Sequence, residues 1–230
     1  MGSKKAVVKA IILSGGSSLR MNLKLPKQLL KIGSKPVLGL ALEPFVSCPE
    51  ISSIVLVANR RFIKQHHSLI KRYNYRKVKR IVTGGSTRQQ SVFNALKAIK
   101  DCDYVVIHDR ARPFVSQKMI RKVLNAAKRY NAATCAVRAV DTTVLEKRGF
   151  IDKRLIREKI WRIQTPQAFR FNLIFKAHLR AQKKGKGLAS DDTQLLLPLK
   201  RRVKLVQSEY RNIKITTKAD LSLAKRIGRG

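Results

Sequence analysis

Short apolar runs alternate with segments of helical period along most of the chain. Runs rich in β-branched residues predict buried strands at residues 7–14, 53–58, 78–82, 104–108 and 133–137. The segments between them predict helices at residues 36–46, 60–73, 88–99 and 116–130. Helices between continuously apolar strands indicate an α/β, Rossmann-like fold, in which a mostly parallel sheet has helices on both faces.

The alternation lapses between residues 141 and 161, where β-branched residues, charges and Gly149 follow no helical period. This segment is typical of a hairpin-like β-arm that protrudes from the sheet. Regular elements resume with a helix at 171–182, strands at 203–206 and 213–216, and a closing helix at 219–227. Because no repeat or low-complexity linker divides the chain, we expect a single domain of residues 1–230.

The charge of the chain bears on its partners more than on its fold. Lys and Arg number 51 against 13 Asp and Glu, a formal net charge of +38. Such a field attracts phosphorylated substrates and nucleic acids alike. The basic residues are spread along the whole chain, so nonspecific nucleic-acid binding is expected. A dedicated nucleic-acid-binding protein is the rival hypothesis, but the aromatic content is only 6% and no RNA-binding motif is present.

The cellular location follows from the cysteines and from the lack of membrane signals. Cys48, Cys102 and Cys135 are widely spaced and form no CxxC pair, which indicates free thiols in a reducing compartment. The apolar run near the N-terminus is too short for a signal peptide and contains Lys9. No stretch reaches the roughly 20 apolar residues that span a bilayer. The sequence therefore predicts a cytoplasmic protein without membrane attachment.

A glycine-rich turn follows the first predicted strand. Residues 14–21 read SGGSSLRM, and Gly15 and Gly16 let the main chain approach an anion closely. Arg20 and Lys27 add cations that could hold a triphosphate from two sides. The alternative is a tight turn with solvated basic residues. The spacing matches neither a Walker loop nor a dinucleotide-binding fingerprint.

Further motifs follow the glycine turn in a fixed order. They are GGSTRQQS at 84–91, HDRARP at 108–113, DT at 141–142, Arg157, TPQ at 165–167, SDD at 190–192 and NIKIT at 212–216. The opening turn alone is similar to the nucleotidyltransferase superfamily, including molybdenum-cofactor guanylyltransferases. The ordered set resembles the 2-C-methyl-D-erythritol 4-phosphate cytidylyltransferase family from about residue 9 to residue 227.

This resemblance implies an enzyme of the non-mevalonate isoprenoid pathway. It would transfer CMP from CTP to methylerythritol 4-phosphate and release pyrophosphate. Ribitol 5-phosphate cytidylyltransferases share nearly every motif and are the nearest alternative. The run SDDT at 190–193 resembles the TDDA run of the methylerythritol phosphate enzymes, and we favour that acceptor for this reason.

The resemblance also implies roles for individual residues. The implied catalytic cations are Arg20, Lys27 and Lys214, and the implied ligand of a magnesium ion is Asp109. A magnesium ion keeps several waters and needs few carboxylates, so one acid can suffice. The implied nucleotide-binding residues are Ser14, Gly15, Gly16, Gly84, Gly85, Ser91 and Asp109, and the implied substrate-binding residues are Arg112, Asp141, Thr142, Arg157 and Thr165.

The arm at 141–161 carries part of this implied site. Thr142 and Arg157 resemble contacts to the substrate phosphate, and in the family the arm reaches across a two-fold axis. A homodimer is therefore expected, with the site completed by the partner subunit. On the residues alone, the arm could equally be a long surface hairpin.

Several positions depart from the family pattern. Ser18 and Ser86 replace a glycine and an acid, and Arg110 and Arg211 are cations beside Asp109 and Asn212. His66 and His67 have no acidic or cysteine partner at metal-ligand spacing, and we interpret them as surface residues. His178, in the late predicted helix, is no better supported as a ligand.

Overall fold

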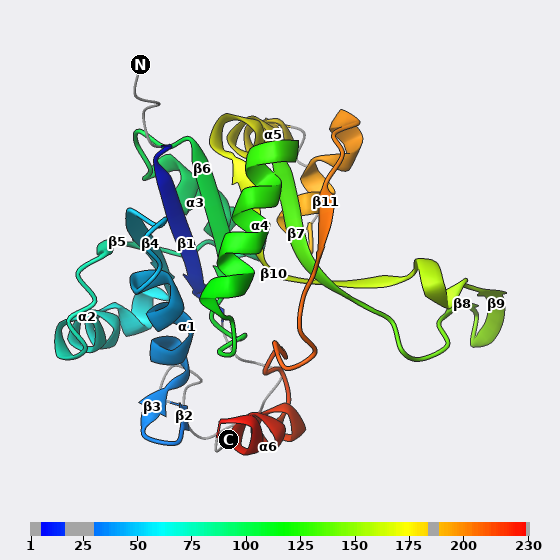
Figure 1. Ribbon diagram of the computed structural model, residues 1–230, viewed down its shortest axis with the longest axis horizontal. Helices are drawn as coiled ribbons and strands as arrows, with labels where there is room; N and C mark the ends of the chain where they lie inside the picture. Colours follow the sequence, from blue (N-terminus) through cyan, green and yellow to red (C-terminus); the bar gives the residue numbers. More distant parts are fainter. Residues whose placement is uncertain (1–5, 17–29, 184–188, 229–230) are drawn as a thin grey trace.

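The computed structural model describes residues 6–16, 30–183 and 189–228 and is built around a seven-stranded sheet (Figure 1). The strand order is β11-β7-β10-β6-β1-β4-β5. In chain order the strands are β1 (Val8–Ser14), β4 (Ser53–Ala58), β5 (Val78–Thr83), β6 (Tyr104–Asp109), β7 (Ala132–Arg138), β10 (Trp161–Arg170) and β11 (Lys204–Gln207). Strand β10 runs antiparallel to β6 and β7, and the other neighbouring pairs are parallel. The predicted mostly parallel sheet is confirmed.

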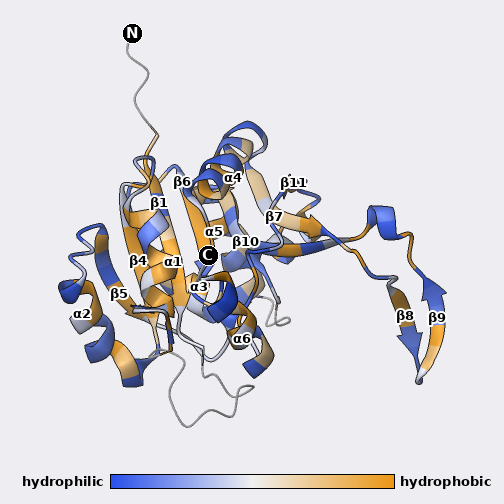
Figure 2. Cartoon of the chain, turned by 60° about the horizontal axis from the view of Figure 1, so that its bottom comes forward, coloured by the Kyte–Doolittle hydropathy of each residue, from blue (hydrophilic) through white to orange (hydrophobic). Residues whose placement is uncertain are grey.

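Helices cover both faces of this sheet, as the pattern predicts. On one face, α1 (Val37–Val46) and α4 (Gln117–Tyr130) pack through a core that includes Leu42 and Ile120, with α2 (Ile63–Arg72) beside them. On the other face, α3 (Arg88–Lys97) and α5 (Phe171–Lys183) pack through a core that includes Leu96 and Ile174. Figure 2 shows the apolar strands enclosed between helices whose outer sides are polar.

Helix α4 shows how the local sequence determines the buried face and the two ends of a helix. Its apolar positions Ile120, Val123, Leu124 and Ala127 are all fully buried. The hydroxyl of Ser116 caps the N-terminus by accepting a hydrogen bond from the Met119 amide at 3.2 Å. The helix ends at Asn131, whose φ of 66° is a left-handed conformation that asparagine tolerates.

Two sequence-based expectations about the C-terminal half are wrong or incomplete. Residues 213–216 were expected to form a strand, but they form an extended loop whose Ile215 amide donates to the Ala111 carbonyl at 2.8 Å. Strand β10 was not expected, because the polar side chains of Gln164, Thr165 and Gln167 break its apolar pattern although all three are buried.

Smaller elements complete the chain. A short hairpin joins β2 (Lys31–Ile32) to β3 (Lys35–Pro36), and the chain closes with α6 (Lys218–Ile227). The 3₁₀ turns are η3 (Arg60–Phe62), η4 (Arg157–Lys159), η5 (Asp192–Leu195) and η6 (Leu197–Leu199). None of the helices in the described part of the chain is long and apolar enough to cross a membrane.

The segment predicted to be an arm forms a hairpin that extends away from the sheet (Figure 1). Strand β8 (Val144–Lys147) pairs antiparallel with β9 (Phe150–Arg154), and every side chain of both strands is exposed. The exposed side chains include Phe150 and Ile151, at 78% and 73%. An isolated two-stranded hairpin with so much apolar surface in water is at most marginally stable.

Candidate active site

The candidate active site lies where β1 and β6 end. The register pairs Leu13 of β1 with Asp109 of β6, while Ser14 pairs with Ala58 of β4 on the other side of β1. Strands β4 and β6 are added to the sheet on opposite sides of β1, so the direction of sheet growth reverses there. In open α/β sheets such a reversal forms the ligand crevice at the carboxyl ends of the strands.

The two glycine-rich turns pack against each other at this edge. A Cβ atom on Gly15 would lie 3.6 Å from the Cα atom of Gly84, and one on Gly85 would lie 2.1 Å from the Cγ atom of Gln90. Any larger residue at Gly85 would thus displace the start of α3. The hydroxyl of Ser91 accepts from the Gly85 amide at 3.0 Å and donates to the Thr87 carbonyl at 2.8 Å, so it shapes the second turn.

The carboxylate of Asp109 is held by two cations. Its Oδ1 atom lies 3.2 Å from Nε of Arg88, and its Oδ2 atom lies 2.8 Å from Nζ of Lys214. Burial would raise the pKa of Asp109, but Arg88 and Lys214 hold it well below its usual range. Asp109 is therefore ionised near neutral pH, as an anion at the carboxyl edge of the sheet.

Arg88 also binds a second carboxylate. Its Nη1 atom lies 2.8 Å from Oδ2 of Asp192, whose Oδ1 atom lies 3.0 Å from Nε2 of His178. Asp192 and His178 are each about 1% exposed. Burial would raise the pKa of Asp192, but Arg88 and His178 lower it. The sequence indicated no role for His178, which α5 turns inward onto Asp192.

Thr165 holds the backbone of Asp109 from the neighbouring strand β10. Its hydroxyl oxygen accepts from the Asp109 amide at 3.1 Å and lies 3.0 Å from Nδ1 of His108. Nε2 of His108 donates to the Arg112 carbonyl at 3.0 Å, so Nδ1 is the acceptor and the Thr165 hydroxyl is the donor. Burial lowers the pKa of His108 to about 4, so the ring is neutral near pH 7.

Arg112 positions the loop that carries Lys214. Its guanidinium donates to the Asn212 carbonyl at 2.8 Å. The side-chain Nδ2 of Asn212 in turn donates to the Thr165 carbonyl at 2.9 Å and to Oε1 of Gln164 at 2.9 Å. Asn212 is thereby fixed to β10, and on the other side of Lys214 the Ile215 amide donates to the Ala111 carbonyl at 2.8 Å. These contacts explain how a loop can place an ammonium group at a defined position.

His66 was expected on the surface, and this prediction is wrong. It is 2% exposed, and its Nε2 atom lies 2.8 Å from the hydroxyl of Ser14 at the start of the first glycine turn. Its Nδ1 atom lies 2.6 Å from the Phe62 carbonyl, so Nδ1 is the donor and Nε2 accepts from Ser14. His67 is exposed, as expected. Burial lowers the pKa of His66.

Arg110 and Arg211, the two arginines that depart from the family pattern, differ in their surroundings. Arg110 directly follows β6, is only 5% exposed, and forms no ion pair with any described residue. The segments outside the described residues contain no Asp or Glu, so the chain offers Arg110 no carboxylate side chain. Arg211 is exposed and precedes the loop that carries Lys214.

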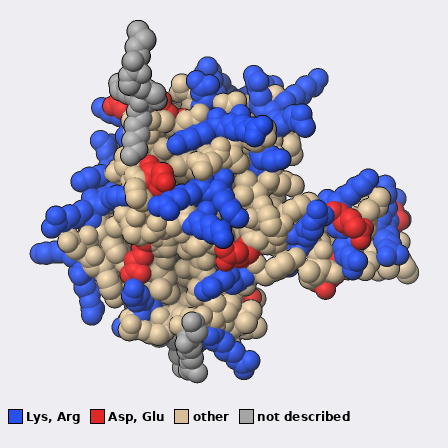
Figure 3. Space-filling model, viewed as in Figure 1, with Lys and Arg blue, Asp and Glu red and all other residues tan. Residues whose placement is uncertain are grey.

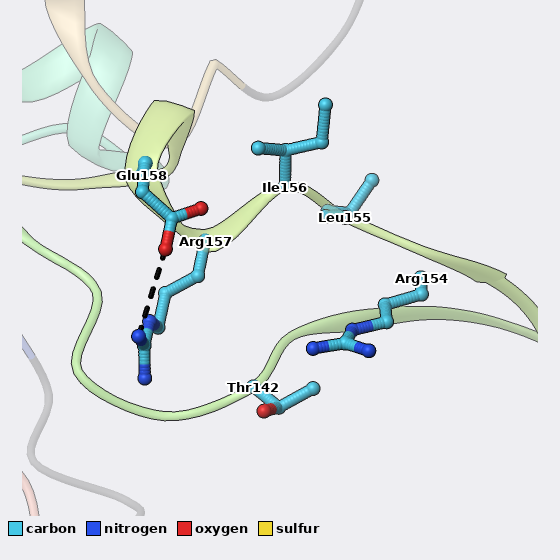
Figure 4. Close-up of a pocket in the computed structure, with 6 residues that line it drawn as sticks. All are labelled: Thr142, Arg154, Leu155, Ile156, Arg157 and Glu158. Carbon is cyan, nitrogen blue, oxygen red and sulfur yellow. Dashed lines mark ion pairs between the residues drawn. The ribbon is translucent and has the colours of Figure 1, made fainter.

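The arm residues form a separate group. Thr142 and Arg157 line a cavity of about 320 Å³ together with Arg154, Leu155, Ile156 and Glu158 (Figure 4). Within the described residues, no hydrogen bond or ion pair joins this group to Asp109 or Lys214. Asp141 is exposed beside Thr142. Arg20, Lys27 and Ser18 lie outside the described residues.

Comparison with known proteins identifies the family of this chain. The profile of the 2-C-methyl-D-erythritol 4-phosphate cytidylyltransferase family matches residues 8–229. The chain belongs to this family. The Clostridium tetani member is 44% identical over 217 residues, which cover 94% of this chain and 88% of that protein. The Geobacillus thermodenitrificans member is 41% identical over 218 residues, which cover 95% of each chain.

A solved structure extends the family assignment to the fold. The 4-diphosphocytidyl-2C-methyl-D-erythritol synthase of Anaerococcus prevotii superimposes with a TM-score of 0.87 at 30% identity, covering 98% of this chain and 97% of that one. As a family member this chain is an enzyme, a cytidylyltransferase of isoprenoid biosynthesis. These predictions, and that of the Rossmann-like α/β fold, are confirmed.

Three residues of this family member's site were not given a role by sequence reasoning. Arg88 and Asp192 fall inside quoted motifs, but nothing in their spacing of 104 positions indicates that they touch. His178 is 14 positions from Asp192, on a different element. One signal was available: Arg88 directly follows Thr87, the N-cap of α3, in a motif to which the family resemblance assigned nucleotide contacts.

Proposed function

We propose that this chain joins the cytidylyl group of CTP to 2-C-methyl-D-erythritol 4-phosphate and releases pyrophosphate. The observation that carries the proposal is the cluster of Asp109, Lys214 and the two glycine turns at the carboxyl edge of the sheet. The two curated relatives described above are named for methylerythritol phosphate, which favours this acceptor over ribitol 5-phosphate.

The reaction needs no general base on the protein. A phosphate monoester has its second pKa near 6 and is largely dianionic at neutral pH. One of its oxygens attacks the α-phosphorus of CTP and forms the new P–O bond. The bond from that phosphorus to the β-bridging oxygen breaks, and pyrophosphate leaves with the electron pair. The enzyme has to hold two polyanions together and stabilise charge at the α-phosphate.

The proposed cations supply that stabilisation. Lys214 presents an ammonium group, 39% exposed, at the edge where the glycine turns lie. The family pattern assigns Arg20 and Lys27 to the same triphosphate. Gly15, Gly16, Gly84 and Gly85 offer main-chain amides to the nucleotide, while Ser14 and Ser91 brace the two turns from within the chain.

A magnesium ion would be held by Asp109. No cluster of three or more His, Cys, Asp or Glu occurs among the described residues, so the protein alone offers no closed metal cage. An ionised Asp109 beside a triphosphate fits an ion that keeps its waters and takes most of its ligands from phosphate. When bound, such an ion neutralises charge on the triphosphate and on the leaving pyrophosphate.

The arm supports a homodimeric enzyme. Thr142 and Arg157 line the cavity at the arm, and the β8–β9 hairpin of this arm extends away from the sheet whose strand β6 ends at Asp109 (Figure 1). A two-fold partner would bring this cationic cavity to a neighbouring nucleotide site, and it would cover the exposed Phe150 and Ile151. We propose that Asp141, Thr142 and Arg157 bind the acceptor phosphate of the partner's site, with Arg112 and Thr165 close to the acceptor from within the chain. We further propose that residues 1–230 form a single domain, of which the arm at about 141–161 is part.

The basic surface is a secondary matter. Lys and Arg side chains are scattered over the face in Figure 3 rather than gathered in one stripe. This distribution suits general attraction of phosphorylated small molecules. Nonspecific nucleic-acid binding stays a prediction, and a steep loss of affinity with salt would be its signature. A cytoplasmic location likewise stays a prediction.

One assay tests the proposed function. Pyrophosphate release is measured with CTP and magnesium, separately with methylerythritol 4-phosphate and ribitol 5-phosphate. The proposal expects turnover with the first acceptor and much lower kcat/KM with the second. Preference for ribitol 5-phosphate, or no release with either, would contradict it.

A further inference from the structure

Arg88 lies between two carboxylates and uses a different nitrogen for each. Nε contacts Oδ1 of Asp109 at 3.2 Å, and Nη1 contacts Oδ2 of Asp192 at 2.8 Å. A free guanidinium prefers to bind one carboxylate with two parallel hydrogen bonds. Here the shorter contact to Asp192 keeps Nη1 away from Asp109, so Arg88 occupies only one of the two Asp109 oxygens.

The other oxygen of Asp109 has a more exchangeable partner. Oδ2 is held by Lys214, whose side chain is 39% exposed, on a loop rather than on a helix or strand. Arg88 is 22% exposed and belongs to the first turn of α3. Lys214 can turn to a phosphate oxygen at little cost, since it gives up one partly exposed ion pair for another.

The carboxylate that restrains Arg88 is itself firmly placed. Asp192 is about 1% exposed, and it accepts from Arg88 on Oδ2 while Oδ1 contacts His178 at 3.0 Å. Its amide donates to Gln167 of β10 at 3.3 Å. The His178 ring stacks on Phe93 of α3, with the planes 2° apart and the centroids 6.2 Å apart. Contacts from α3, α5 and β10 thus converge on Asp192.

We propose that Asp192 and His178 are positioning residues of the reaction, which restrain Arg88 so that Oδ2 of Asp109 remains available once Lys214 moves to the nucleotide. Arg88 stays on Oδ1 and keeps the carboxylate oriented. The inference rests on the proposed function, since it assumes CTP with magnesium as the ligand of this edge. It requires nothing of the acceptor.

Loss of the restraint has a definite consequence. Without the Asp192 carboxylate, Arg88 can turn its guanidinium onto Asp109 and bind both oxygens. A bidentate arginine competes directly with a divalent cation for the same carboxylate. Asp192→Asn should therefore raise the magnesium concentration needed for CTP binding by about tenfold, corresponding to about 1.4 kcal/mol.

The test measures binding rather than turnover. Thermal unfolding is followed at one fixed CTP concentration, without acceptor, while magnesium is titrated into wild type, Asp192→Asn and Arg88→Gln/Asp192→Asn. Magnesium binding by free CTP is common to all three samples. The double variant lacks the competing guanidinium, so its midpoint should return toward that of wild type. A purely structural role of Asp192 predicts no such rescue.

Asp191→Asn is the matched control. Asp191 caps η5 by accepting from the Thr193 amide at 2.8 Å, but it forms no ion pair with a described Lys or Arg. Its substitution should disturb η5 without moving the magnesium midpoint. His178→Phe is the second test, because it keeps an aromatic ring against Phe93 but loses the hydrogen bond to Asp192; its midpoint should rise by a few-fold, which also serves if Asp192→Asn fails to fold.

The outcomes are distinct. An unchanged midpoint in Asp192→Asn or in His178→Phe overturns the inference. So does a shift that persists in the double variant, or an equal shift in Asp191→Asn. Absence of any magnesium-dependent CTP binding in wild type would instead contradict the proposed function.

Discussion

Arg110→Met should make the unliganded protein more stable. Burial lowers the pKa of Arg110 to about 10. The difference from the ordinary value of an arginine corresponds to about 3 kcal/mol. At pH 7 the guanidinium is charged in the folded and in the unfolded protein. Its lowered pKa therefore means that the whole free-energy cost of burying the charge reduces the stability of the folded state. Methionine keeps much of the side-chain length and removes the charge.

The expected change in thermal stability is large enough to measure. For a chain of this size, 1 kcal/mol moves Tm by about 2–4 °C. Relief of most of the burial cost should therefore raise Tm by roughly 5–10 °C at pH 7 without nucleotide. Arg180→Met, at an exposed position of α5, is the matched control and should leave Tm within about 1–2 °C of wild type.

The same variant should bind CTP less well. Arg110 follows Asp109 at the nucleotide edge, and its amide donates to the Leu13 carbonyl at 3.0 Å. A triphosphate there would offset the charge that no carboxylate side chain of this protein neutralises. The rise in Tm that CTP causes should thus be smaller in Arg110→Met than in wild type, whereas Arg211→Asp should change it little, since Arg211 is exposed and screened. A lower Tm of unliganded Arg110→Met would refute the reasoning.

Three further predictions concern the rest of the site. Lys27→Ala should lower kcat by about two orders of magnitude and weaken CTP binding far less, because one transition-state contact is worth about 3 kcal/mol; an unchanged kcat removes Lys27 from the mechanism. Mixed dimers of Lys27→Ala with Arg157→Ala should recover activity that neither homodimer has, and a fully active monomer by light scattering contradicts this. Stability of wild type should fall as the pH drops below about 6.5, because His66 is buried with a lowered pKa and resists the protonation that the unfolded chain accepts; His66→Gln should lose less between pH 7 and pH 5, and equal losses contradict the assignment.

The central strands were predictable because their residues are buried on both faces of the sheet. Ile11, Ile12 and Ile107 are buried by helices on both faces, so their strands appear as continuous apolar runs. Strand β10 has a mixed environment. Its Gln164, Thr165 and Gln167 are buried but bind Ser208, His108 and Thr134, and a polar side chain with a distant partner has the same sequence pattern as a solvated one.

The histidines show the same limit. On α2, His66 lies among basic residues, and its neighbour His67 is exposed. What makes His66 an interior residue is Ser14, which is 52 positions away and belongs to the first strand. The periodicity of apolar residues around His66 cannot indicate a contact with a residue so distant in the sequence. The family motifs predicted more of the site than the local patterns did. They assigned Asp109 and Lys214 to one site, and the two side chains are 2.8 Å apart although 105 positions separate them.

The excess of positive charge and the selectivity of the site have different origins. A net charge of +38 attracts any polyanion, and it acts mainly on encounter rates that salt reduces. Selection of a nucleotide with its metal requires negative charge at one defined position among many cations. Asp109 keeps that charge because Arg88 and Lys214 stabilise it in a buried place. In the proposed arrangement, Asp192 holds Nη1 of Arg88 and thereby leaves Oδ2 of Asp109 more accessible to a divalent cation.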